Sequence, residues 1–334
     1  MTKFDDAMPW IEATLEHGPA DEMLRRAITL DGVDTKELRL VKTTLIRHRL
    51  GRRAVVEYAV ELLSSDRPRT IRIVGKTRAK GLDREVVRVL TDLRAAGFGL
   101  DSPDGISVAE VVGVAPEWHM WLAIKIEGPT ATDLLAGSPV HFSARRIADV
   151  ATKIHRSGVA SRRLHSIGDE IDVLRAALDR ASDARPELAS RIEAIGDGCR
   201  SIAQATERGK PGSIHRDFYS DQIVISGDRL VVLDFDLFSA GEIELDIGNF
   251  TAHVTELSAR QRGHPYGLDE VRRGIVDRAV ESGASRELIG VYDLLALARH
   301  VWISTRITGR NHVTETILAE CERRLEAASL EQLS

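Results

Sequence analysis

Three consecutive runs of β-forming residues constrain the fold of this chain most strongly. They cover residues 40–48, 54–63 and 70–77, and short turns at 49–53 and 66–68 separate them. In the second run apolar and polar residues alternate, which is typical of a strand with one buried face. Three strands joined by tight turns predict an antiparallel meander.

The residues after the meander change from a strand pattern to a helix pattern. A helix is predicted from about 82 to 96, ending at Gly97, and two further strands over 108–114 and 119–126. Residues 127–129 break the pattern, and the rest of the chain is mainly helical. We therefore expect an α+β fold with a β-rich N-terminal lobe, one helix in that lobe, and a larger helical lobe.

The expected lobes are residues 1–126 and 127–334, and the first lobe begins with a helical extension over 1–36. Two short helical patterns lie within 4–30, with a break expected near Gly18-Pro19. The helical lobe contains one β-like insert at 223–233. The chain length of 334 residues favours two lobes over a single core.

Composition excludes several classes of protein. The formal net charge is −5 and the pI about 6.2, so the chain has no basic footprint for nucleic acid. No apolar run is long enough for a membrane span, and residues 1–10 do not form a secretory signal. Cys199 and Cys321 lie in unrelated contexts, which favours two free thiols. A cytoplasmic protein without membrane partners is expected.

Residues 214–236 carry the clearest functional signal. Asp217 ends a His-Arg-Asp triplet, Gln222 follows shortly after, and Asp234 ends an apolar run. Phosphoryl transfer needs a carboxylate to orient a hydroxyl, and oxygen ligands to hold magnesium on the nucleotide phosphates. Asp217 is the candidate base, and Gln222 and Asp234 are candidate metal ligands.

The insert 223–233 gives a physical reason for the two metal ligands to meet. It is predicted to be a β-hairpin, and a hairpin returns its ends, here Gln222 and Asp234, to the same place. Oxygen donors suit Mg²⁺, and Asp236 could add a further oxygen. The alternative is a loop whose Asp and Gln side chains satisfy backbone groups. The combined spacing and apolar flanks favour the metal site.

Lys76 lies on the third predicted strand and precedes the predicted helix that bears Glu85. This order fits an ion pair that directs the ammonium group at nucleotide phosphates. A lysine on a solvated strand face is the alternative. Asp83 and Glu61 are alternative partners for Lys76.

The turn around Gly51 has fewer glycines than a phosphate-covering loop usually has. Its arginines could bind phosphate or could form an exposed basic turn. No Walker-type phosphate loop is present. Near the candidate base, His215 is expected to brace its loop by hydrogen bonds, and Asp246 to cap a helix or brace a loop.

These motifs, from His215 to Gln222, at 233–236 and at 245–250, resemble those of the aminoglycoside phosphotransferase and choline kinase-like family. The resemblance spans about 38–300. It implies a bilobal protein-kinase-like fold and phosphorylation of a small-molecule hydroxyl by ATP or GTP with Mg²⁺. Asp217 would be the base, Gln222 and Asp234 metal ligands, and Lys76 a phosphate contact.

The resemblance also implies that backbone groups of Lys125, Ile126 and Glu127 hold the nucleobase. Two departures concern the metal site: Gln222 replaces the commoner Asn, and Asp-Phe-Asp replaces Asp-Phe-Gly. The acceptor would be a sugar, an amino sugar or an aminoglycoside-like molecule, and Arg216 and Tyr219 favour a sugar or amino sugar over an antibiotic. The alternative functions are a catalytically silent nucleotide-binding or regulatory module and a protein kinase.

Overall fold

The computed structural model describes residues 5–63, 69–137, 144–209 and 211–332, with side chains described to 328. The expected turn at 66–68 lies outside the described residues. The chain forms two compact units. Unit 1 comprises Met1–Gly128 and Ser226–Leu233, and unit 2 comprises Pro129–Ile225 and Asp234–Ser334. The expected boundary at 126/127, with the role of each lobe, stays a prediction.

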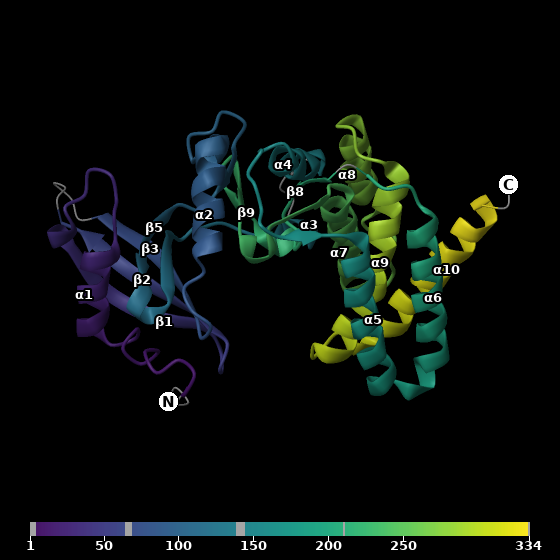
Figure 1. Ribbon diagram of the computed structural model, residues 1–334, viewed down its shortest axis with the longest axis horizontal. Helices are drawn as coiled ribbons and strands as arrows, with labels where there is room; N and C mark the ends of the chain where they lie inside the picture. The colour runs from purple at the N-terminus through teal and green to yellow at the C-terminus, as the bar shows by residue number, and fades with distance from the viewer. Residues whose placement is uncertain (1–4, 64–68, 138–143, 210, 333–334) are drawn as a thin grey trace. The chain divides into compact units, whose positions relative to one another are not determined.

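Unit 1 is built on a five-stranded sheet of order β1-β2-β3-β6-β5 (Figure 1). Its strands are β1 Leu38–Arg49, β2 Arg53–Leu62, β3 Arg69–Arg78, β5 Val111–Ala115 and β6 Met120–Ile124. Every neighbouring pair in the sheet is antiparallel, so the predicted meander is present. In β2 the buried residues alternate with partly exposed ones, as the sequence pattern predicted.

Helix α1, His17–Ala27, packs on this sheet and buries Met23 and Leu24. Of the two helical patterns expected within 4–30, the first is wrong, because no helix precedes His17 among the described residues, and α1 begins at His17 and includes Gly18-Pro19 in its first turn. Proline is tolerated there because the first amide groups of a helix have no partner within the helix. Residues 6–16 before the helix form turns.

The segment expected as one strand over 108–114 is two strands. Ile106–Val108 forms β4, which pairs in parallel with β10, Arg229–Val232, whereas β5 pairs with β6. Helix α2, Arg84–Leu93, continues into a kinked turn, Arg94–Phe98, with Gly97 at φ 94°. Gly97 therefore ends the helix as expected.

Unit 2 is mainly helical. Its helices are α3 Ala131–Leu135, α4 Arg145–His155, α5 Ile167–Ala184, α6 Ala189–Ala205, α7 Glu244–Arg262, α8 Asp269–Glu281, α9 Arg286–Arg306 and α10 Thr314–Gln332. Its strands are β7 Leu164–His165, β8 Pro211–Ile214, β9 Ile223–Ser226 and β11 Ser239–Glu242. Strand β11 pairs antiparallel with β8 and parallel with β7.

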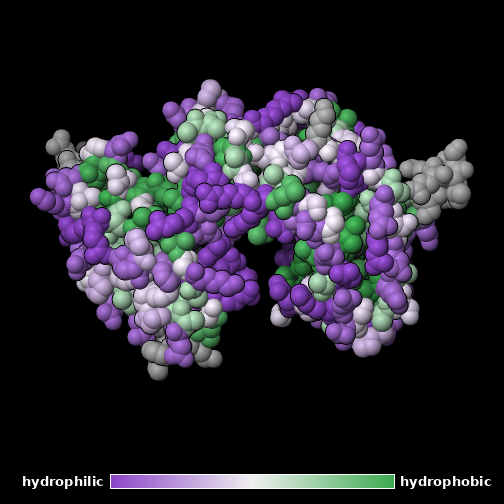
Figure 2. Space-filling model, in the orientation of Figure 1, coloured by the Kyte–Doolittle hydropathy of each residue, from purple (hydrophilic) through white to green (hydrophobic). Residues whose placement is uncertain are grey.

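One hydrophobic core joins α5, α6, α7, α9 and α10 and includes the free thiols of Cys199 and Cys321. Helices α7 and α9 lie in close contact at Gly248, where an added Cβ would lie 2.5 Å from Tyr292 Cβ. Hydrophilic residues cover most of the visible surface of each unit (Figure 2). No described helix is long and apolar enough to cross a membrane.

Gly248→Ala should lower the free energy of unfolding by about 1–3 kcal/mol, because backbone atoms of α9 leave no room for a methyl group. Urea denaturation measures this change. Gly290→Ala in α9 is the control, since an added Cβ there meets no atom within 4 Å. It should raise the free energy of unfolding by about 0.5–1 kcal/mol. Equal effects of the two substitutions would contradict this packing account.

Candidate active site

The loop that carries Asp217 begins at the end of strand β8. Ile214, the last residue of β8, pairs with Ser239 of β11. The pairing therefore holds the start of the Asp217 loop beside the segment that follows Asp234 and Asp236. Phe235 strengthens this arrangement, since its ring lies 4.7 Å from the ring of the buried His215.

Asp246 fixes the backbone immediately before Asp217. Its carboxylate is fully buried near the start of α7. It accepts the backbone N–H of His215 at 2.9 Å and that of Arg216 at 2.7 Å. His155 of α4 donates its Nε2–H to the same carboxylate at 3.0 Å. Asp246 therefore braces the loop, one of the two roles that the sequence suggested.

These hydrogen bonds hold a strained backbone. Arg216 has φ 71°, a left-handed conformation that non-glycine residues seldom adopt and that costs on the order of 1–3 kcal/mol. Asp234 has φ 60°. Such conformations persist only where several interactions fix the surrounding chain. Arg216 directly precedes the candidate base Asp217, and Asp234 is itself a candidate metal ligand.

Asp217 and Asp234 lie close enough to repel one another. Burial, and then the negative charge of Asp234, raise the pKa of Asp217 above its ordinary value, whereas His215, Arg299 and Arg216 act to lower it. A dication would relieve the repulsion between two carboxylates. The donor set therefore fits a hard cation such as Mg²⁺.

Gln222 is buried and lies in a short 3₁₀ turn after Asp217. Its side chain hydrogen-bonds to Tyr219, whose pKa is raised to about 12 by burial and by Asp217, Asp221 and Asp234. That hydrogen bond acts to lower the Tyr219 pKa, in opposition to burial. The side-chain oxygen of Gln222 is the atom of its amide that suits a cation.

The Asp217 loop also forms an aromatic stack. The Tyr219 ring lies 4.5 Å from the ring of His253 of α7, with an angle of 18° between the planes.

Asp236 is partly buried, and its backbone oxygen accepts a hydrogen bond from Arg163 at 2.6 Å. The described residues contain no group of three or more His, Cys, Asp or Glu arranged around a metal position.

Lys76 of unit 1 lies on β3 opposite Trp121 of β6. Its ammonium nitrogen is 5.3 Å from the centre of the ring of the buried Trp121. Glu85, in the first turn of α2, accepts hydrogen bonds from Arg88 at 3.2 and 2.7 Å. The Lys76–Glu85 ion pair stays a prediction.

The two alternative partners of Lys76 have other roles. Asp83 is the N-cap of α2, where it accepts the N–H of Val86 at 3.2 Å, and it also pairs with Arg78. Glu61 pairs with Arg39 on the neighbouring strand. Both contacts stabilise local structure in unit 1.

The residues expected to hold the nucleobase follow β6. The backbone N–H of Lys125 donates to Arg72 O at 2.8 Å, and its ammonium group pairs with Glu57 at 2.6 Å. Glu127 is exposed and lies 3.2 Å from Arg72. Since the Lys125 N–H is already bonded, a nucleobase contact there would use its carbonyl or the backbone of Ile126 and Glu127.

The turn between β1 and β2 is fixed by the N-terminal segment. Gly51 has φ 66°, and its N–H donates to Asp5 Oδ2 at 2.9 Å. His48 donates to the same oxygen at 2.8 Å. The Gly51 N–H is the largest cause that lowers the pKa of Asp5. The amide that a phosphate-covering loop would offer is therefore engaged by a carboxylate.

Sequence reasoning missed two residues near Asp217. Asn249 lies one turn after Asp246 on α7 and donates its Nδ2–H to Phe218 O at 2.9 Å. Arg299 of α9 donates to Asn249 Oδ1 at 2.7 Å. The spacing of Asp246 and Asn249 places them on one face of α7 and could have suggested Asn249. No local pattern marks Arg299.

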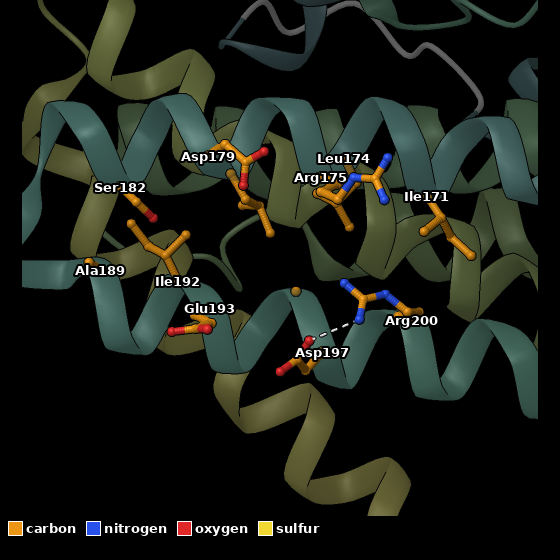
Figure 3. A pocket seen from close by; sticks show the side chains of 12 residues that line it. Ile171, Leu174, Arg175, Asp179, Ser182, Ala189, Ile192, Glu193, Asp197 and Arg200 are labelled. Carbon is orange, nitrogen blue, oxygen red and sulfur yellow. Dashed lines mark hydrogen bonds and ion pairs between the residues drawn. The ribbon is translucent and has the colours of Figure 1, made fainter.

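A separate pocket of about 370 Å³ lies between α5 and α6 (Figure 3). Apolar side chains such as Leu174 and Ile192 line it, and Arg200 and Asp197 form an ion pair at its edge. None of the predicted site residues lines this pocket. It is therefore distinct from the Asp217 loop.

The sequence matches the model of a phosphotransferase enzyme family over residues 59–266, which is more than half of the chain. Among curated proteins, none matches the sequence significantly.

Solved structures share the fold at low sequence identity. A choline kinase from Cryptosporidium parvum matches with a TM-score of 0.61 and 12% identity, covering 94% of this chain and 96% of that chain. A glucosamine kinase in complex with glucosamine, ADP and inorganic phosphate matches with a TM-score of 0.61 and 14% identity, covering 89% and 83%. A spectinomycin phosphotransferase in complex with ADP and spectinomycin matches with a TM-score of 0.55 and 10% identity, covering 92% and 93%. The predicted α+β kinase-like fold is confirmed.

Asp246→Asn should lower the free energy of unfolding by about 1–3 kcal/mol, because the amide offers one acceptor where the carboxylate oxygens accept three donors. Chemical denaturation measures the change. Asp277→Asn, an exposed residue that pairs with Arg286, is the matched control and should change stability by no more than about 0.5 kcal/mol. Wild-type stability of Asp246→Asn would contradict the bracing role.

Proposed function

Because the chain belongs to the phosphotransferase enzyme family, we propose that it transfers the γ-phosphoryl group of ATP to a hydroxyl of a sugar, an amino sugar or a similar small molecule. Asp217 is the base, and Gln222 and Asp234 hold Mg²⁺. The observation that carries the proposal is the bracing of the backbone before Asp217 by Asp246, in a loop where the charge of Asp234 raises the pKa of Asp217.

Asp217 orients the acceptor hydroxyl and takes its proton. The acceptor oxygen bonds to the γ-phosphorus as the bond from that phosphorus to the β–γ bridging oxygen breaks, and ADP leaves. Mg²⁺ would supply positive charge for the phosphate oxygens. Because Asp217 is held rigidly, catalysis comes from positioning and electrostatics without a covalent enzyme intermediate.

The supporting roles are also proposals. In unit 1, Lys76 contacts phosphate with Glu85 as its partner, and the backbone at Lys125, Ile126 and Glu127 contacts the nucleobase. In unit 2, Asp236 adds an oxygen near the metal. ATP is favoured over GTP because two of the structures with this fold contain ADP with their substrates.

A catalytically silent nucleotide-binding or regulatory module is the second candidate function. It is favoured by the contact between the Gly51 N–H and Asp5, which removes a phosphate donor from the β1–β2 turn. The presence of Asp217, Gln222, Asp234 and Lys76 together favours an enzyme.

Release of ADP or GDP with a panel of sugars, amino sugars, aminoglycosides and amino alcohols separates the two functions. An enzyme releases ADP faster with one class of acceptor than without it. A silent module shows a thermal shift with Mg²⁺ and nucleotide but no release above slow hydrolysis for any acceptor. The panel also gives the acceptor class.

Asp217→Asn should lower kcat by about 10²–10⁴-fold, because the amide cannot accept the hydroxyl proton. Nucleotide affinity should stay close to that of the wild type. Steady-state kinetics and calorimetry measure the two quantities, with Asp277→Asn as the control that leaves both unchanged. Turnover at the wild-type rate in Asp217→Asn would remove this residue from the mechanism.

Asp234→Asn should abolish the magnesium-dependent part of nucleotide binding, because the variant lacks the charged oxygen ligand. Asparagine tolerates the left-handed backbone at this position, so the loop is expected to keep its conformation. Calorimetry with ATP, with and without Mg²⁺, measures the effect. If Mg²⁺ strengthens binding equally in the variant and the wild type, Asp234 is not a metal ligand.

A further inference from the structure

Arg299 lies on α9, which packs against both α5 and α7 (Figure 1). Its guanidinium group contacts both neighbouring helices. One nitrogen donates to Asn249 Oδ1 of α7 at 2.7 Å, and another lies 3.5 Å from Glu170 Oε2 of α5. Glu170 is buried and accepts a hydrogen bond from His165 at 2.7 Å. The guanidinium group is thus held on two sides.

Asn249 links Arg299 to the loop that carries Asp217. It is buried, and its Nδ2–H donates to the backbone carbonyl of Phe218 at 2.9 Å. A guanidinium group only donates hydrogen bonds and a carbonyl only accepts them. The two neighbours therefore fix the orientation of the amide, with its oxygen toward Arg299 and its nitrogen toward Phe218.

We propose that Arg299 is a positioning residue for phosphoryl transfer, which acts by orienting Asn249 so that Asn249 holds the Phe218 carbonyl, directly after Asp217. The proposal rests on the proposed function. Arg299 itself touches neither acceptor nor nucleotide in this role.

This contact complements that of Asp246. Asp246 binds backbone N–H groups before Asp217, whereas Asn249 binds the carbonyl of the residue after it. The two side chains lie three positions apart on α7, so one helix face holds the loop on both sides of the base. Fixing only the side before Asp217 would leave the backbone after it without this hydrogen bond from α7.

Arginine suits this role better than lysine. Its planar group offers donors in a fixed fork, so that it can meet Asn249 and Glu170 at the same time. A lysine ammonium carries all its donors on one nitrogen, so it would meet both acceptors only if both lay within hydrogen-bond distance of that atom. Arg299 also acts to lower the pKa of the neighbouring Asp217, in opposition to burial, which agrees with its proximity to the base.

The test compares Arg299→Gln, Asn249→Asp and the double variant. Arg299→Gln removes the group that orients Asn249. Asn249→Asp keeps an acceptor for Arg299 but has no N–H for the Phe218 carbonyl. Arg286→Gln, also on α9 and paired with Asp277 at 2.6 Å, is the matched control. Unfolding curves establish that each variant is folded.

With an acceptor from the panel, each single variant should lower kcat by about tenfold to hundredfold and leave the KM for nucleotide near the wild-type value, because only the base is misplaced. The double variant should be no slower than the slower single variant, since both changes break one chain of contacts. Arg286→Gln should match the wild type. Normal kcat in Asn249→Asp, or multiplicative losses in the double variant, would overturn the proposal.

A second readout does not depend on turnover. The N–H of Tyr219 belongs to the same peptide as the Phe218 carbonyl, so its NMR resonance reports the contact with Asn249. It should shift in both single variants and not in Arg286→Gln. An unchanged resonance overturns the proposal, whereas a shifted resonance in a protein that phosphorylates no acceptor overturns only the proposed function.

Discussion

The fully buried carboxylate of Asp246 is the interaction on which the candidate site depends. It binds the N–H groups of His215 and Arg216 and so holds Arg216 in a left-handed conformation. Because Arg216 directly precedes Asp217, its backbone conformation sets the position of Asp217. Burying a charge is costly unless it is hydrogen-bonded, and here backbone and His155 donors surround it. Without the carboxylate, the N–H groups that it binds would be buried without an acceptor, and no hydrogen bond to Asp246 would offset the strain at Arg216.

The packing of helices in unit 2 also helps to hold the loop that carries Asp217. Gly248 lets α7 approach α9 closely, next to Asn249 and within reach of Arg299. Strands β8 and β11 hold the two ends of the loop region together. The chemistry-bearing residues lie in loops, while rigid elements of the scaffold fix the backbone around them.

Much of the fold follows from patterns within short stretches of the sequence. Alternation predicted β2, and the tight turns predicted the meander in which β3 carries Lys76. Local rules failed where the outcome depended on distant residues. The segment 108–114 divides because β4 pairs with β10, more than a hundred residues further along the chain. Gly18-Pro19 begins α1, which is stabilised by burial against the sheet.

The candidate site is likewise indicated by a local motif, and the roles of its residues stay predictions. Asp217, Gln222 and Asp234 lie in one motif, and in the structure Asp217 and Asp234 both act to raise the pKa of Tyr219, which hydrogen-bonds to Gln222. Arg299 could not be predicted, because its role comes from the packing of α9 on α7. The engagement of the β1–β2 turn by the N-terminal segment is likewise a contact between distant stretches of chain, which no local pattern records.

The position of the metal tests the central claim most directly. A crystal structure with Mg²⁺ and a non-hydrolysable ATP analogue should show the ion about 2.1 Å from an oxygen of Asp234 and from the side-chain oxygen of Gln222. Asp217 should lie near the γ-phosphate without binding the ion. An ion bound by other residues, with Gln222 and Asp234 turned away from it, would contradict the account.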